Sequence, residues 1–319
     1  MISLQEREKE QPFSRAAKLL FSAIPGIDKA PGVAVLHAEK LKEEEFMKNW
    51  VNRNKACLIK GAVAHWPAVK KWKEKTYWLS HLGNFEVDVF PHENFNTPDL
   101  QNNGREVMHF HDAIERLHAG KDPIFNLPSK EINPNSYFEP LKAEMAGFTF
   151  LPNPGNPRVY PRMRIFIYRG ASTAWHYHDA DETLMCQVNG TKKVALLPPS
   201  IPHTREVVQF LNSEEYLKGK KLDPALGLNP SVAEVGEGDA LYIPPYWYHA
   251  VAPVDDGIGY TLAFCWKSPW HKMGNFSSYF VRRLYKAAVW PVNPYTPFLP
   301  FIAAYAGISY LGGRLFKKI

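Results

Sequence analysis

Cysteine is scarce in this chain. Its 319 residues include three cysteines, Cys57, Cys186 and Cys265, which are too few and too far apart for a disulfide framework or a zinc ribbon. Residues 1–11 alternate charges and lack an apolar core segment, so they do not resemble a secretory signal. Both absences favour a reducing compartment, and we expect a cytoplasmic protein.

A strong charge of one sign is also missing. Lys and Arg number 38 and Asp and Glu number 32, which gives a formal net charge of +6. The acidic residues are interspersed and no arginine-rich patch stands out, so the charge permits nucleic-acid contact without arguing for it. A protein or a small molecule is therefore favoured as the partner over nucleic acid.

The remaining pattern is that of a β-rich fold. With 45% hydrophobic residues, the chain can bury a sizeable core. Short strand-like segments such as FEVDVF at 85–90 and RMRIFIY at 162–168 are separated by polar or proline-rich turns, which is typical of an antiparallel barrel. Helices are expected at 41–51 and 111–118, and the prolines of 123–161 indicate a long loop over the barrel mouth.

The most informative segments are WHYHDADETLMCQVNGTKKVALLPPS at 175–200 and GDALYIPPYWYHAV at 238–251. Because successive side chains on a strand point to opposite faces, His176 and His178 can point the same way. His249 follows a second apolar strand, which can lie across from the first in an antiparallel barrel. Three protein ligands on one face leave coordination positions open, as non-haem Fe(II) requires, usually with two histidines and one carboxylate.

These residues resemble the JmjC and cupin-like 2-oxoglutarate/Fe(II) oxygenases, in particular the small hydroxylases related to the asparaginyl hydroxylase that inhibits hypoxia-inducible factor. The family pattern Gln-x-x-Gly-x-Lys followed by Leu-x-Pro-Pro is matched at 187–192 and 196–199. The pattern Gly-Asp-x-Leu-Tyr-Ile-Pro-x-x-Trp-x-His is matched at 238–249, and ACLIKGA at 56–62 is similar to the family's entry strand. The resemblance implies a double-stranded β-helix, a jelly-roll barrel with flanking helices.

The resemblance also implies roles for individual residues. His176 and His249 would bind Fe(II), Lys192 would pair with the distal carboxylate of 2-oxoglutarate, and Thr173 would donate a hydrogen bond to that carboxylate. A lysine at this position is also expected on physical grounds, because an unpaired carboxylate inside an apolar barrel is costly. Lys193 is adjacent, so only one of the two lysines faces inward on a strand.

The third metal ligand depends on spacing, because this chain has one residue more between His176 and the following strand than the family usually has. If the extra residue lies in the loop, His178 takes the place of the aspartate and the metal is bound by three imidazoles. If it forms a bulge, which re-aims the next side chain, Asp179 is the ligand. We favour Asp179, because decarboxylating 2-oxoglutarate hydroxylases usually keep the carboxylate. Asp181 and Glu182 lie deeper in the expected loop and are less favoured.

We expect three parts in the chain: an N-terminal extension at 1–23, a JmjC/cupin-like oxygenase domain at 24–270 and a C-terminal helical, apolar and basic extension at 271–319. The extension has aromatic residues beside Arg282, Arg283, Lys317 and Lys318, which suits packing on the barrel, a homodimer contact or peripheral membrane contact. A membrane span is not expected, because prolines and glycines interrupt the apolar run.

The function expected from the sequence is that of a 2-oxoglutarate- and Fe(II)-dependent oxygenase that uses O₂, most simply a hydroxylase of a protein side chain or a small molecule. Two alternatives remain: a non-catalytic metal-binding cupin scaffold and a three-histidine cupin dioxygenase. Lys192 distinguishes them, since a cupin that does not bind 2-oxoglutarate needs no inward cation there.

Overall fold

A computed structural model describes residues 18–92, 104–289 and 298–316. The strands are β1 (Ala34–His37), β2 (Cys57–Lys60), β3 (Glu86–Val89), β4 (Glu106–His109), β5 (Phe125–Glu131), β6 (Met163–Arg169), β7 (Thr173–His176), β8 (Asp181–Asn189), β9 (Lys192–Leu197), β10 (Ser231–Val235), β11 (Ala240–Ile243), β12 (Tyr248–Pro253) and β13 (Ile258–Lys267). The helices are α3 (Glu43–Phe46), α4 (Ala68–Lys71), α5 (Lys75–His81), α6 (Phe110–Ala119), α7 (Thr204–Leu211), α8 (Tyr279–Val289) and α9 (Leu299–Leu315), with η1 (Ile27–Lys29), η2 (Met47–Val51), η3 (Glu139–Glu144), η4 (Pro224–Leu226) and η5 (Trp270–Met273). Most of the expected N-terminal extension, at 1–17, and Lys317 and Lys318 of the tail lie outside the described residues.

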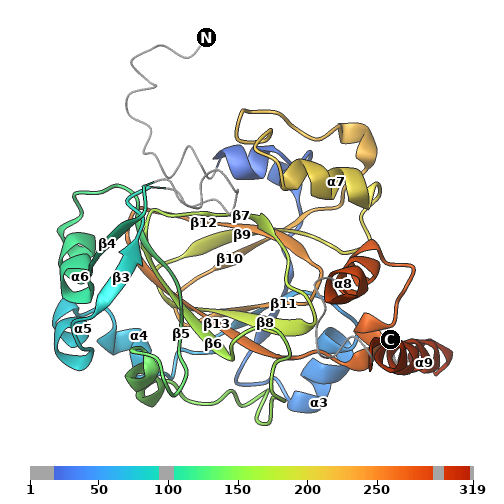
Figure 1. The fold of residues 1–319 in the computed structure, drawn as a ribbon, viewed down its shortest axis with the longest axis horizontal. Coiled ribbons are helices and arrows are strands. Elements are labelled where there is room, and N and C mark those ends of the chain that lie inside the picture. The colour runs from blue at the N-terminus through green and yellow to red at the C-terminus, as the bar shows by residue number, and fades with distance from the viewer. Residues whose placement is uncertain (1–17, 93–103, 290–297, 317–319) are drawn as a thin grey trace.

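Two sheets face each other to form the barrel. Within the described ranges, one sheet has seven strands in the order β1-β2-β11-β8-β13-β6-β5 and the other has four in the order β10-β9-β12-β7. Figure 1 shows these sheets stacked, with helices on the outside. The expected jelly-roll barrel, mainly β with flanking helices, is confirmed.

The space between the sheets is filled on one side and hollow on the other. Apolar residues of both sheets fill the side nearest β2, β10 and β11, and this cluster comprises Ala56, Leu58, Met185, Val194, Leu196, Ala233, Val235, Leu241, Ile243 and Val251. On the other side, β6 alternates as a two-sided strand should: Ile165 and Ile167 join the core outside the barrel, whereas Phe166 and Tyr168 face the interior. The hollow side therefore has room for a ligand.

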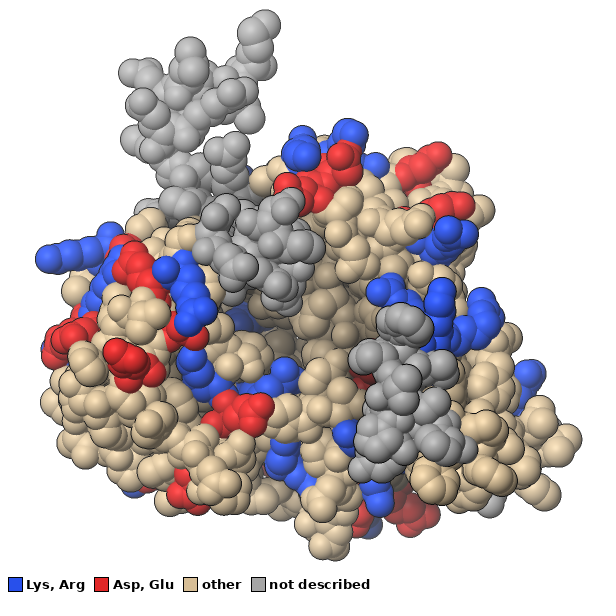
Figure 2. Space-filling model, viewed as in Figure 1, with Lys and Arg blue, Asp and Glu red and all other residues tan. Residues whose placement is uncertain are grey.

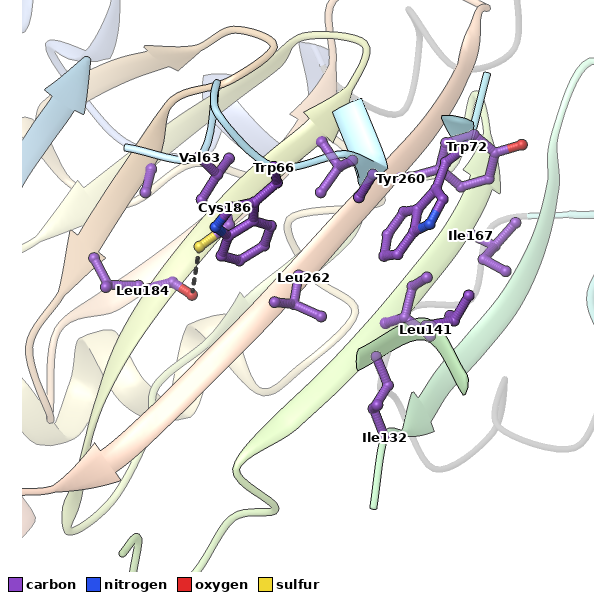
Figure 3. Packing of buried hydrophobic residues seen from close by; sticks show 14 of the residues in the cluster. Val63, Trp66, Trp72, Ile132, Leu141, Ile167, Leu184, Cys186, Tyr260 and Leu262 are labelled. Carbon is purple, nitrogen blue, oxygen red and sulfur yellow. Dashed lines mark hydrogen bonds between the residues drawn. The ribbon is translucent and has the colours of Figure 1, made fainter. Parts of the chain in front are cut away.

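The largest core lies on the outer face of the seven-stranded sheet. Trp66 and Trp72 cover β8 and β13 there, near Leu184 and Tyr260 (Figure 3). The ring of Trp72 is 6.3 Å from that of Tyr260, edge to face, and Trp78 Nε1 donates to the Trp72 carbonyl at 2.7 Å. Buried aromatic rings contribute large apolar areas and directional contacts, so this core stabilises the two strands that lie behind the hollow.

The proline-rich segment 123–161 is not one long loop. It contains β5, which pairs with β6 at the edge of the seven-stranded sheet, and the short helix η3. Pro128 is tolerated because the register with β6 shifts between Leu127 and Lys130, and edge strands accept proline at such bulges. The expectation of a loop was wrong for residues 125–131, which form β5, and residues 126–129 of this strand line the hollow.

Helix α9 packs on η5. Ala306 is fully buried, and a Cβ on Gly274 would lie 2.0 Å from the Ala306 carbonyl oxygen, so the two segments approach at a distance that only glycine permits. The helix continues through Gly307 and Gly312, so the expectation that glycines interrupt this run was wrong. Pro300 lies in the first turn, where the missing N–H is not needed. In the described part of the chain, no helix has both the length and the apolar character that crossing a membrane requires.

We predict that Lys272→Met destabilises the fold strongly. Glu182 is fully buried, and Lys272 Nζ, Ser268 Oγ and Tyr242 Oη donate to it at 2.6, 2.8 and 2.5 Å. Removing the cation leaves a buried carboxylate uncompensated, which typically costs about 3–5 kcal/mol of unfolding free energy. Lys73→Met is the control, because the exposed pair of Lys73 with Glu237 is worth about 0–1 kcal/mol. Urea unfolding measures both, and equal losses would contradict the prediction.

Candidate metal centre and ligand cavity

Two neighbouring strands of the four-stranded sheet bring the histidines together. β7 and β12 are antiparallel, and His176 at the end of β7 lies directly opposite His249 in β12. Their ring centroids are 4.1 Å apart. His178 follows in the loop after β7, and its ring is 4.9 Å from that of His249 and 5.3 Å from that of His176. The three imidazoles therefore form one compact group.

Each ring of this group has one nitrogen available for a metal ion. One candidate ligand atom from each histidine lies within 4.8 Å of the others. The Nδ1 atoms of His176 and His249 donate to backbone carbonyls two residues earlier, at 2.8 and 2.9 Å. His178 Nδ1 lies 3.0 Å from Thr183 Oγ1. Because Nδ1 is engaged in all three rings, Nε2 is the nitrogen left to bind a metal, and the partner of Nδ1 sets the ring orientation.

The surroundings of the three imidazoles disfavour their protonated form. Burial lowers the pKa of His176, and it lowers the pKa of His178 and His249 well below the usual value, where the neighbouring histidines add to the effect. A neutral imidazole is the form that binds metals, so a metal ion would have no bound proton to displace.

Asp179 lies outside this group. Its Oδ1 is buried without a hydrogen bond, and burial raises the pKa of its carboxyl to about 6, although Arg283 acts in the opposite direction. The register of β7 with β12 is irregular between Thr173 and His176, before the loop at 177–180, and not after His176. Ala180 turns the chain with a φ of 51°. The extra residue is thus taken up by the loop, and the structure brings His178 to the other two histidines.

The two following acids have structural partners. Both oxygens of Asp181 accept hydrogen bonds from the backbone N–H groups of residues 158–160, at 2.7 to 3.0 Å. Glu182 is held by the buried pair with Lys272. These contacts occupy the acidic side chains nearest to the loop, and neither acid belongs to the histidine group.

Lys192 points into the hollow side of the barrel, whereas Lys193 is exposed. The side chain of Lys192 is 6% exposed, its Nζ lies 3.8 Å from the ring centroid of Tyr168, and burial lowers its pKa to about 7. Among the described residues, no carboxylate lies within ion-pair distance of it. A buried cation without a protein partner is costly, so this position suits an anionic ligand.

The histidine group and Lys192 line one cavity, whereas Asp179 is not among its lining residues. Its volume is about 460 Å³, and its walls come from β5 to β9 and from β11 to β13. Thr173, Lys192 and the three histidines line the same space. The space-filling view shows a hollow between the two sheets (Figure 2). A cavity of this size accommodates a small dicarboxylate beside a metal ion.

Arg164 and Tyr160 were not predicted from the sequence as site residues. Both line the cavity, and the Tyr160 ring centroid is 5.5 Å from that of His178. Arg164 could have been predicted, because alternate residues of a strand lie on one face and Arg164 shares a face of β6 with Phe166 and Tyr168. Tyr160 lies in an irregular segment, where no periodicity indicates the direction of a side chain.

Comparison with known proteins places the chain in a family. The Cupin-like domain profile matches residues 43–272. Jumonji C domain-containing protein 5 of Drosophila melanogaster is 26% identical over 244 residues, which are 70% of this chain and 57% of that protein. The bifunctional peptidase and (3S)-lysyl hydroxylase JMJD7 of Homo sapiens is 25% identical over 296 residues, 77% of this chain and 85% of that protein.

A plant relative has a similar level of identity. Lysine-specific demethylase JMJ30 of Arabidopsis thaliana is 24% identical over 238 residues, 72% of this chain and 53% of that protein. The chain thus spans little more than half the length of the fly and plant relatives. The resemblance to JmjC and cupin-like proteins is confirmed.

Proposed function

The chain belongs to the Cupin-like domain family, and from this premise we propose that it is a 2-oxoglutarate- and Fe(II)-dependent oxygenase, a hydroxylase of a protein side chain or a small molecule. The observation that carries the proposal is the position of Lys192. This buried cation has no carboxylate partner in the described part of the chain, and it shares one cavity with three neutral histidines. A metal ion and a dicarboxylate together match that arrangement.

His176, His178 and His249 would hold the metal. Their Nδ1 atoms are engaged, which leaves three converging nitrogens and open positions for other ligands. Thr183 would orient His178, and its Oγ1 is in turn 3.6 Å from Cys265 Sγ. We therefore replace Asp179 by His178 in the proposed ligand set.

Lys192 and Thr173 would bind the distal carboxylate of 2-oxoglutarate. Lys192 supplies the compensating charge, and Thr173 at the start of β7 supplies a hydroxyl in the same cavity. Bound Fe(II) would supply the activation of O₂ and the oxidative decarboxylation of 2-oxoglutarate. The apolar walls, which include Phe166, Met185 and Ile243, would limit the access of water to the reacting groups.

A three-histidine dioxygenase without 2-oxoglutarate is the second candidate, because the group that the structure assembles contains no carboxylate. The inward Lys192 weighs against it, since such an enzyme leaves this cation without a function. A non-catalytic scaffold meets the same objection.

We also propose the division of the chain that the sequence predicts: an extension at 1–23, the oxygenase domain at 24–270 and a helical extension at 271–319, in a cytoplasmic protein. The outer side of α9 has exposed apolar residues at helical spacing, namely Phe301, Tyr305, Ile308, Leu311 and Leu315. Contact of this face with a second copy or with a membrane surface stays a prediction.

We predict that His176→Ala, His178→Ala and His249→Ala each abolish stoichiometric binding of Fe(II) or Mn(II), because each removes a ligand nitrogen. The loss of metal affinity should exceed the about 10–100-fold loss that follows when a residue hydrogen-bonded to a metal ligand is replaced. Asp179→Ala should retain stoichiometric binding. Anaerobic calorimetry with Mn(II) measures the four variants, and circular dichroism checks their fold. Loss of binding in Asp179→Ala together with retention in His178→Ala would restore the aspartate as the ligand.

We predict that Lys192→Met weakens 2-oxoglutarate binding to the Mn(II)-loaded protein about ten- to a hundredfold, since a hydrogen bond to a charged group is worth about 1.5–3 kcal/mol. Lys193→Met is the matched control, because it removes the same charge from the outer face of β9, and it should bind like the unmodified protein. Calorimetry provides the affinities. If both variants bound equally well, Lys192 would not be the partner of the carboxylate.

We also predict that 2-oxoglutarate affinity falls as the pH rises above about 7. Burial lowers the pKa of Lys192 to about 7, so the lysine loses its charge above this pH. The complex requires the ammonium form, so above this pH binding must first take up a proton, at a cost of up to about tenfold per pH unit. Lys192→Arg stays charged over the whole range and should flatten the dependence. Titrations from pH 6 to 9 measure this, and an unchanged slope in the arginine variant would refute it.

A further inference from the structure

The cavity contains two basic side chains and no acidic one. Arg164 and Lys192 both line it, and no Asp or Glu is among its lining residues within the described part of the chain. The protein therefore contributes only positive charge to this space, before any metal ion is bound.

Among the described residues, no oxygen atom accepts a hydrogen bond from Arg164. It comes from β6, its Nε is buried without a hydrogen-bond partner, and its Nη2 is 3.9 Å from Cys265 Sγ, a weak acceptor. Its Cζ lies 4.9 Å from the ring centroid of Tyr160. No ion pair of Arg164 occurs among the described residues. A partly desolvated guanidinium with unsatisfied donors is costly unless a ligand satisfies them, and its planar fork matches carboxylates and phosphates.

The two cations serve different ends of the cavity. Lys192 Nζ lies over Tyr168, which is four positions along β6 from Arg164, or about 13 Å at the rise of a strand. Arg164 instead stacks on Tyr160, whose ring neighbours that of His178. A carboxylate bound at Lys192 therefore does not satisfy Arg164.

The charge balance leads to the same result, on the premise of the proposed function. A divalent metal and the two basic side chains supply four positive charges, and 2-oxoglutarate neutralises two of them. Two uncompensated charges in a largely apolar cavity are costly. A lysine or arginine side chain of a substrate would increase the imbalance, because the lining offers it no carboxylate and places Arg164 opposite it.

We infer that the substrate presents an anionic oxygen group, a carboxylate or a phosphate, which binds Arg164 beside the histidine group. The cavity thus selects against the cationic side chains on which relatives named lysyl hydroxylase and lysine-specific demethylase act. Arg164 is the residue that sets this specificity.

The test is a binding experiment on the full chain loaded with Mn(II) and 2-oxoglutarate without oxygen. The probes are four blocked amino acids, N-acetyl N-methylamides of aspartate, phosphoserine, asparagine and lysine, titrated in ligand-observed NMR. We expect aspartate or phosphoserine to bind about ten- to a hundredfold more tightly than asparagine, with lysine weakest. The better of the two anions identifies whether the group is a carboxylate or a phosphate.

Arg164→Gln should lose this preference, and Arg164→Lys should keep part of it, because charge remains without the fork. Lys193→Met, which removes a charge outside the cavity, should keep all of it. Equal or tighter binding of asparagine or lysine, no binding of either anion, or an unchanged preference in Arg164→Gln would each overturn the inference.

Loading of Mn(II) and 2-oxoglutarate is measured first in every variant. Failure to load the unmodified protein would refute the proposed function itself, whereas normal loading without anion preference refutes only the role of Arg164.

Discussion

The pairing of β12 with both β7 and β9 is the constraint on which the site depends. Through β7 it places His249 opposite His176, and through β9 it places Pro253 opposite Lys192. One strand in the middle of the four-stranded sheet therefore sets the distance between the histidine group and the buried cation. That strand pairs along both of its edges, so backbone hydrogen bonds to two neighbouring strands position the site.

The barrel can hold a polar site because its apolar packing is unevenly distributed. One side of the interior is closed by aliphatic residues of both sheets, and the outer faces carry separate cores under the helices. These cores stabilise the strands without filling the other side. The cavity can therefore hold polar and charged side chains that would destabilise a packed core. Burying such groups costs stability, which is typical of residues that bind a ligand.

Charge is the property in which this site departs from the pattern it resembles. The family pattern has an acid beside two histidines, whereas the group assembled here has three imidazoles. Replacing a carboxylate by a neutral ring leaves the cavity more positive by one charge, and Arg164 adds to that excess. Both features favour anions in the cavity. Substrate class therefore does not follow from the names of relatives that are only about a quarter identical to this chain over the aligned residues.

Local sequence determined the elements that depend on short-range pattern. The alternation of FEVDVF and RMRIFIY predicted β3 and β6, and the helix at 111–118 ends at Gly120 in the left-handed conformation, as a C-terminal glycine cap requires. Alternation also indicated that only one of Lys192 and Lys193 faces inward. These features follow from backbone geometry, which a few neighbouring residues determine.

Only the tertiary structure shows that His178, and not Asp179, lies beside His176 and His249, because this depends on where the barrel absorbs one extra residue. A loop and a bulge are equally compatible with the local sequence, and the register of β7 with β12 belongs to two distant segments. The same holds for β5, whose prolines suggested a loop until an edge position on β6 accommodated them. Among the described residues Arg164 has no ion pair and no acid lines the cavity, and both facts are properties of the assembled barrel. They depend on the strands that come together there and not on the residues adjacent to Arg164 in sequence.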